Sequence, residues 1–89
     1  MKKEIVDNII KKSLTPIYVF DIDNLKSRIK YLRKMLSERI QICYAIKANT
    51  FVVKEINDDI DRFEVCSPGE YHICEEVKVT SEKIVISGV

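Results

Sequence analysis

The chain has 89 residues, with 15 Lys or Arg against 14 Asp or Glu, so a formal net charge of +1 excludes any partner assignment made from charge alone, and we expect no nucleic-acid partner. No apolar run approaches the roughly 20 residues of a membrane-spanning helix, and the N-terminus lacks the apolar stretch of a secretory signal, so we expect a cytoplasmic protein without membrane contact. The two Gly and two Pro are few for a hairpin-rich β fold, which favours helices and crossover connections.

The first third of the chain predicts a helix, a strand and a second helix. Residues 3–12 place four aliphatic side chains on one helical face, and residues 15–16, Thr-Pro, end this helix. The apolar run 17–20 then predicts a strand. Asp23 can cap the next helix, over residues 25–36, where apolar residues recur every three or four positions and basic residues take the other faces. We interpret that basic face as solvated.

From residue 40 onward, short strands alternate with short helices. This alternation with tight connections is typical of parallel βαβ units, so the predicted fold class is α/β. Three strands leave two free edges, whereas a closed (β/α)₈ barrel needs about 250 residues. We therefore expect residues 1–89 to be the N-terminal part of one longer domain. The predicted elements are a strand over 40–46, a helix over 52–60, a strand over 63–66, a helix over 69–77 and a strand over 84–86.

The strand predicted over residues 40–46 ends in a chemically unusual way. Alternation places bulky side chains, including Tyr44, on one face of the strand and small ones, including Ala45, on the other. Lys47 follows Ala45 on the face with the small side chains. Ligands of parallel α/β folds bind at the carboxyl ends of the strands, where Lys47 follows. A desolvated lysine there can attack a carbonyl group. A lysine that simply leaves the strand for solvent is the alternative from spacing alone.

Three motifs resemble one enzyme family. Residues 44–49 read Y-A-I-K-A-N, which resembles the Y-A-x-K-A-N motif of the pyridoxal-phosphate-dependent ornithine/diaminopimelate/arginine decarboxylases. Residues 15–21, T-P-I-Y-V-F-D, are similar to the T-P-x-Y-V-Y-D segment that opens these enzymes. Residues 63–70, F-E-V-C-S-P-G-E, are similar to their F-D-x-x-S-x-x-E stretch. The motifs occur in the family's order and together span most of the chain.

The resemblance implies an alanine-racemase-like, TIM-like (β/α)₈ barrel that binds pyridoxal 5'-phosphate and is followed by a β domain. It implies that Lys47 forms the Schiff base and that Glu64 is the second catalytic residue. It also implies a homodimer that decarboxylates a basic or diamino amino acid of the diaminopimelate, ornithine, lysine or arginine type. The residues it implies for cofactor binding are Lys47, Ala45, Glu64, Ser67 and Glu70.

Two positions depart from the family pattern. Glu64 stands where the family usually has Asp, and Ser87 stands where diaminopimelate decarboxylases commonly have a histidine. A racemase of the same fold, or a non-catalytic relative that acts as a regulatory binding module, remains as an alternative. Racemases tend to continue the lysine motif as A-N-A-Y-G, whereas residues 48–51 read A-N-T-F, which favours the decarboxylase branch.

Some of these residues also have purely structural interpretations. Ser67 and Glu70 form an S-x-x-E capping box, in which the serine hydroxyl accepts from the Glu70 amide and the glutamate reaches back to the Ser67 amide. His72 has no ligand partner at metal spacing, so we place it on a helix surface and expect no metal site. The three cysteines, which lack C-x-x-C spacing, are interpreted as small buried side chains: Cys43, Cys66 and Cys74.

Overall fold

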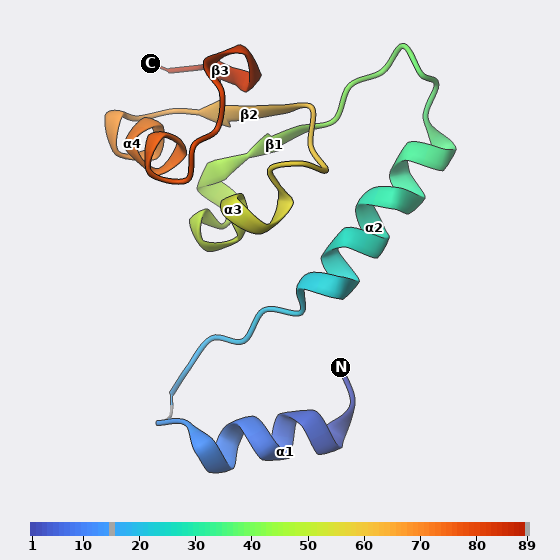
Figure 1. Cartoon of the computed structure of the whole chain (residues 1–89), viewed down its shortest axis with the longest axis vertical. Coiled ribbons are helices and arrows are strands. Elements are labelled where there is room, and N and C mark those ends of the chain that lie inside the picture. Colours follow the sequence, from blue (N-terminus) through green and yellow to red (C-terminus); the bar gives the residue numbers. More distant parts are fainter. Residues whose placement is uncertain (15, 89) are drawn as a thin grey trace.

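The structure is a computed structural model that describes residues 1–14 and 16–88 (Figure 1). None of the helices in these ranges is long and apolar enough to cross a membrane. In chain order the elements are α1 (Lys3–Lys12), α2 (Ile22–Met35), β1 (Cys43–Ala45), the 3-10 turns η1 (Ile46–Ala48) and η2 (Thr50–Val52), α3 (Val53–Ile56), β2 (Arg62–Val65), α4 (Pro68–Glu76), η3 (Ser81–Lys83) and β3 (Ile84–Ile86).

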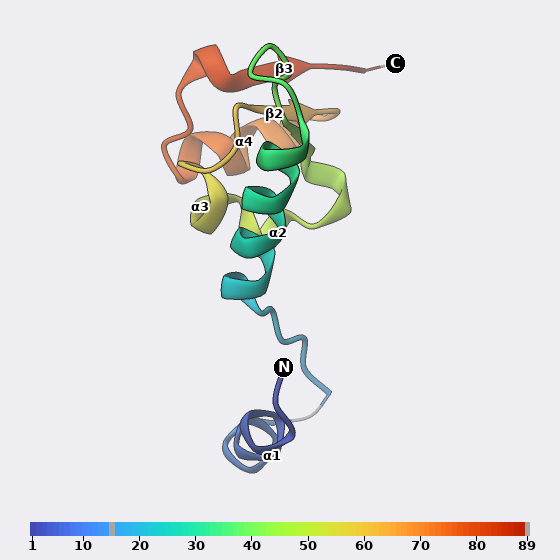
Figure 2. The same cartoon turned by 90° about the vertical axis from the view of Figure 1, so that its right-hand side faces the viewer.

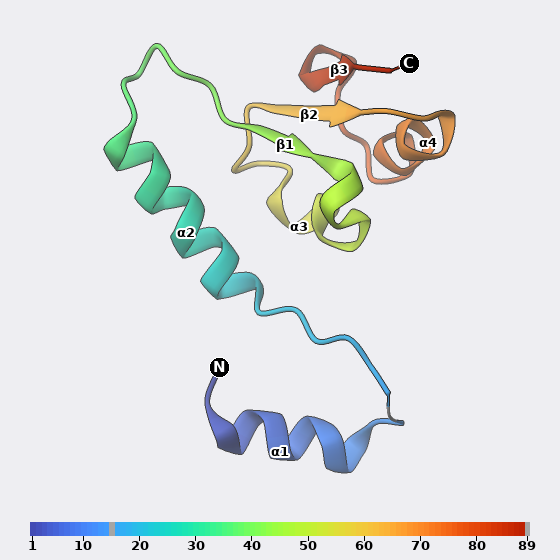
Figure 3. The ribbon, with the colours of Figure 1, turned by 180° about the vertical axis from the view of Figure 1, so that it is seen from behind.

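The three strands form one parallel sheet in the order β1-β2-β3. Strand β2 is central, and Figure 3 shows it running between β1 and β3. Its Phe63 pairs with Tyr44 on one side and Ile84 on the other, and Glu64 pairs with Ala45 and Val85. The predicted α/β class and the parallel βαβαβ order are therefore confirmed for this part of the chain. The number of strands in a complete barrel stays a prediction.

The hydrophobic core lies on one side of this sheet. Phe63 and Val65 point into it with 0% and 2% exposure, and helices α2, α3 and α4 lie on this side (Figure 2). Tyr44 packs against the core and meets Phe63 edge to face, with ring centroids 6.2 Å apart. The buried members of the core are Ile29, Ile46, Val52, Val53, Ile56, Ile60, Phe63, Val65, Cys74 and Val79.

The strand predicted over residues 17–20 is wrong. These residues form no strand in the described chain, and their side chains are 40% to 90% exposed. A strand needs a neighbour to receive its backbone hydrogen bonds, and none of the described segments pairs with this one. The segment instead leads from α1, which has the predicted bounds, to α2. Thr15, expected to help end α1, lies outside the described residues.

Other predicted boundaries also move. Asp21, not Asp23, caps α2, because its Oδ1 accepts the Asn24 amide at 3.0 Å. The helix expected over 52–60 shrinks to α3, since Asn and Asp after Ile56 compete with helical hydrogen bonds and form a turn. The strand expected over 40–46 shrinks to β1. Ile40, placed on the buried face by alternation, is therefore 50% exposed in the preceding turn.

A polar network fixes α2 to the start of the sheet. One Asp61 carboxylate oxygen accepts both the Ile42 amide at 2.7 Å and Arg33 Nη1 at 3.1 Å. Arg33 Nη2 also donates to the Asp59 carbonyl at 2.6 Å, and Lys26 pairs with the Asp59 carboxylate at 3.4 Å. The Ile42 hydrogen bond, followed by the Arg33 bond, lowers the pKa of Asp61 below its usual range. The Asp61 carboxylate thus connects β1, β2 and α2.

Replacing Asp61 with Ala is expected to lower the free energy of unfolding by about 1–3 kcal/mol, because the Ile42 amide loses its acceptor. Since folding lowers this pKa, the contribution is present above the unfolded pKa of about 4 and is lost as pH falls through the folded value. Urea unfolding at pH 7 and at acid pH measures both effects. Asp58→Ala, at an exposed turn position, is the control; an equal loss in both variants would contradict the prediction.

Candidate functional site

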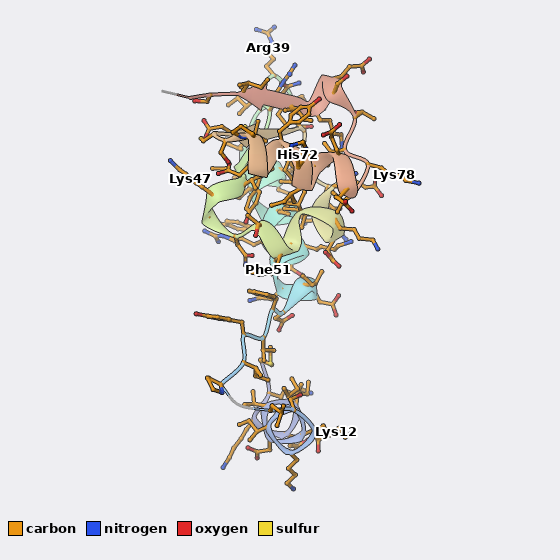
Figure 4. The ribbon with its side chains drawn as sticks, turned by 90° about the vertical axis from the view of Figure 1, so that its left-hand side faces the viewer. Lys12, Arg39, Lys47, Phe51, His72 and Lys78 are labelled. Carbon is orange, nitrogen blue, oxygen red and sulfur yellow. The ribbon has the colours of Figure 1, made fainter. Side chains whose placement is uncertain are left out.

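Lys47 lies in the turn that directly follows β1. The strand ends at Ala45, one residue earlier than predicted, and the chain then enters η1, so Lys47 belongs to a 3-10 turn. Ile46 is fully buried beneath this turn, whereas Lys47 is exposed. Figure 4 shows the Lys47 side chain extending from the ribbon on the side away from His72. The expectation that Lys47 stands at the carboxyl end of a parallel strand is confirmed.

Asn49 organises this turn. Its amide donates to the Ile46 carbonyl at 3.0 Å, its carbonyl accepts the Tyr44 hydroxyl at 2.8 Å, and its side-chain oxygen accepts the Phe51 amide at 2.9 Å. Burial raises the pKa of Tyr44, so its hydroxyl remains a donor at neutral pH. Three hydrogen bonds therefore fix the backbone on both sides of Lys47. No sequence pattern predicted this role of Asn49, although Asn is a common helix cap.

The side of the sheet opposite the helices, here termed the open face, carries Cys43, Ala45, Arg62, Glu64 and Val85. Glu64 projects there because its neighbours Phe63 and Val65 point into the core, and it is half-buried. Ala45 and Val85 pair with Glu64 on either side, so one row of this face holds a small residue, a carboxylate and a valine. Ala45 leaves space beside Glu64. Glu64 thus lies on the side of the sheet opposite Phe63 and Val65, as strand alternation requires.

Glu64 and Cys66 are in contact at the carboxyl end of the open face, and Lys47 lies within electrostatic range of Cys66. The Cys66 thiol donates to Glu64 Oε1 over 3.8 Å. Partial desolvation and the nearby carboxylates of Glu64 and Glu70 raise the pKa of Cys66, while the charge of Lys47 opposes them. Desolvation followed by the Glu64 charge also raises the pKa of Cys43. A cation and two carboxylates thus lie within electrostatic range of one exposed thiol.

Ser67 and Glu70 begin α4 and act as its cap. The Ser67 hydroxyl accepts the Glu70 amide at 3.2 Å, as predicted. Glu70 Oε1 does not reach back to the Ser67 amide; it accepts the Cys66 amide instead, at 3.0 Å. The carboxylate therefore fixes the chain between β2 and α4 one residue earlier than a standard capping box. Contact of either residue with a cofactor stays a prediction.

The remaining candidate residues lie in ordinary surroundings. His72 is exposed and contacts Glu75 at 3.0 Å, as expected for a helix surface. Cys74 is buried, but Cys43 and Cys66 are exposed, so the expectation of three buried cysteines is wrong for these two. Both follow the alternation of β1 and β2 onto the open face. Across the described ranges, no group of three or more His, Cys, Asp or Glu side chains is arranged to hold a metal ion.

Replacing Ser67 with Ala is expected to lower the free energy of unfolding by about 1 kcal/mol, because the Glu70 amide loses its cap. Ser27→Ala, at an exposed position inside α2, is the matched control and is expected to change stability by a few tenths of a kcal/mol at most. Urea unfolding of both variants measures the difference. Equal stabilities would show that the Ser67 hydroxyl contributes no cap.

Comparison with known proteins relates this chain to a decarboxylase. It is 32% identical over 77 residues to the diaminopimelate decarboxylase of Aquifex aeolicus (strain VF5), a match that covers 84% of this chain and 18% of that protein. The chain thus spans about a fifth of the length of this curated relative. No family model matches the chain, and no solved structure matches it. The match supports a decarboxylase-related protein, and the three motifs agree with it.

The residues of the site fit pyridoxal phosphate. An aldehyde-bearing cofactor needs an accessible primary amine, which the exposed Lys47 supplies. It also needs space near that amine, and on the β1 side of Glu64 the open face carries only the methyl group of Ala45. The described residues, 1–14 and 16–88, thus supply the amine and one wall of such a site.

Proposed function

We propose that this chain is part of a pyridoxal-phosphate-dependent decarboxylase that acts on a basic or diamino amino acid, with Lys47 holding the cofactor. The observation that carries the proposal is the exposed amine of Lys47 at the carboxyl end of β1, in a turn fixed by Asn49. The charges of Lys47 and Glu64 both act on the Cys66 thiol. The Y-A-I-K-A-N motif and the match to a diaminopimelate decarboxylase support the same assignment.

The chain's own residues would bind and orient the cofactor. When bound, pyridoxal phosphate supplies an electron sink for the electron pair left when the substrate carboxylate departs as carbon dioxide. Lys47 would hold the cofactor through its side-chain amine. The Asn49 hydrogen bonds keep the Lys47 turn in one conformation, which limits the orientations open to the amine. Ala45 leaves room beside it.

Glu64 would act through its charge. Its carboxylate is half-buried and raises the pKa of both open-face thiols, Cys43 and Cys66, so its negative charge reaches along this face. A negative charge in this position favours the protonated form of a nearby nitrogen. Glu64 would therefore hold a proton on the nitrogen through which Lys47 carries the cofactor.

The whole protein is proposed to be a homodimer in which residues 1–89 form the first part of the barrel. Exposed apolar side chains support burial against further chain: Leu14 is 90% exposed and Ile86, at the edge strand β3, is 77% exposed. Substrate-binding groups would come from later strands and from the second subunit.

Borohydride reduction of the protein that carries this chain, after incubation with pyridoxal phosphate, is expected to fix the label on Lys47. The reason is that Lys47 is the lysine that lies in the turn directly after β1, at the carboxyl end of the strand. Peptide mapping by mass spectrometry locates the label. Lys54→Arg, at an exposed position of α3, should leave labelling unchanged, whereas Lys47→Arg should abolish it. A label that remains on another lysine would refute the assignment.

Replacing Glu64 with Gln is expected to lower turnover about tenfold or more, because one pKa unit at the neighbouring nitrogen changes its protonation ratio tenfold. The fold should persist, since Glu64 lies outside the core. Decarboxylation rates measured across pH, together with far-UV circular dichroism, separate the two effects. Glu55→Gln on α3 is the matched control. Unchanged turnover in Glu64→Gln would make this carboxylate purely structural.

A further inference from the structure

Two aromatic side chains from distant parts of the chain stack beside the Lys47 turn. Phe20, which precedes α2, and Phe51, in η2, have ring centroids 6.0 Å apart and ring planes 22° apart. Phe51 is 76% exposed and Phe20 is 41% exposed, so neither ring belongs to the buried core. Stacked aromatic rings attract each other beyond the effect of buried area. The pair therefore fixes two surface segments relative to each other.

Two grooves adjoin this pair. One, of about 450 Å³, has Val19 and Phe20 on one side and Tyr44, Asn49 and Val52 on the other. The second, of about 330 Å³, is lined by Tyr18 and by both stacked rings, together with the turn from Lys47 to Thr50. Phe20 contributes to both grooves. The segment before α2 thus forms a wall next to the turn that carries the candidate amine.

The contact between the segment before α2 and the Lys47 turn is made by side chains. In the described chain, the backbone of residues 16–20 forms no hydrogen bond with the Lys47 turn, and the Phe20–Phe51 stack is the aromatic contact that joins them. Fixing Phe51 also restrains the turn, because the Phe51 amide is bonded to the Asn49 side chain and the Asn49 amide to Ile46. Lys47 lies in the chain between Ile46 and Asn49, which this last hydrogen bond joins.

We propose that Phe51, through its stack with Phe20, is a positioning residue that holds the Lys47 turn in its conformation. This role rests on the proposed function, because the turn needs a fixed conformation only if the Lys47 amine reacts. Figure 4 shows Phe51 on the side of the body that faces the segment leading to α1, while Lys47 extends elsewhere. Phe51 therefore acts on the turn through its backbone hydrogen bond to the Asn49 side chain.

Amide hydrogen exchange in the unliganded chain tests the proposal. Phe51→Ala is expected to speed exchange of the Asn49 and Phe51 amides about two- to tenfold, the range that corresponds to losing one aromatic pair. Phe20→Ala should give the same increase although Phe20 is remote in sequence. The double variant should exchange no faster than either single variant, because both remove one interaction. Phe51→Tyr, which keeps a stacking ring, should restore the slow exchange.

The matched control is Tyr31→Ala, which removes a 51% exposed aromatic ring from α2 and should leave both amides unchanged. Unchanged exchange in Phe51→Ala, or additive effects of the two alanine substitutions, would overturn the proposal. Faster exchange that extended to Phe63 and Val65 would also overturn it, because the loss would then be global.

A second measurement separates this proposal from the proposed function. In the protein that carries this chain, Phe51→Ala should lower the amount of pyridoxal phosphate that borohydride fixes on Lys47 at least twofold. If the unsubstituted protein carried no label on Lys47, the proposed function would fail, while the exchange data would still report on the stack. Normal labelling with faster exchange would show that the stack does not position the amine, which would overturn this inference alone.

Discussion

Strand β2 is the constraint on which the rest of the structure depends. It receives hydrogen bonds on both edges, from β1 and β3, and its alternating side chains divide the molecule into a covered side and the open face. Phe63 and Val65 supply the centre of the core, and the helices pack against them. Glu64 lies between Phe63 and Val65 in the strand, so its side chain points to the open face. One four-residue strand thus sets both the core and the position of the candidate carboxylate.

The accuracy of the sequence predictions follows how local each signal is. The helix at residues 3–12 and the strand at 84–86 were predicted with the observed bounds, because helical periodicity and a short apolar run between turns are local patterns. Residues 17–20 have equally strong strand-forming side chains and yet form no strand, because pairing depends on a neighbour. The ends of the helix expected over 52–60 failed for a different reason: the Asn and Asp side chains that follow Ile56 favour a turn.

The site shows the same division. The position of Lys47 after a parallel strand and the orientation of Glu64 follow from alternation, so the sequence was sufficient for both. The Asn49 hydrogen bonds were missed, because the bond from the Tyr44 hydroxyl to the Asn49 carbonyl arises only when the chain leaves β1 as a 3-10 turn. No periodic pattern encodes such a turn. The Phe20–Phe51 stack was missed because its partners lie 31 positions apart.

The side of the sheet covered by helices and the open face differ in composition. The core residues are apolar, and no charged or polar side chain is fully buried among the described residues. Stability therefore depends on the covered side, where burial of apolar area is the main favourable contribution. The open face buries little, so its amine, carboxylate and thiols are available for chemistry without a large cost to folding. On this face, desolvation and then the nearby Glu64 carboxylate raise the pKa of the Cys66 thiol. The same short strand thus supplies the centre of the core and presents Glu64 on the open face.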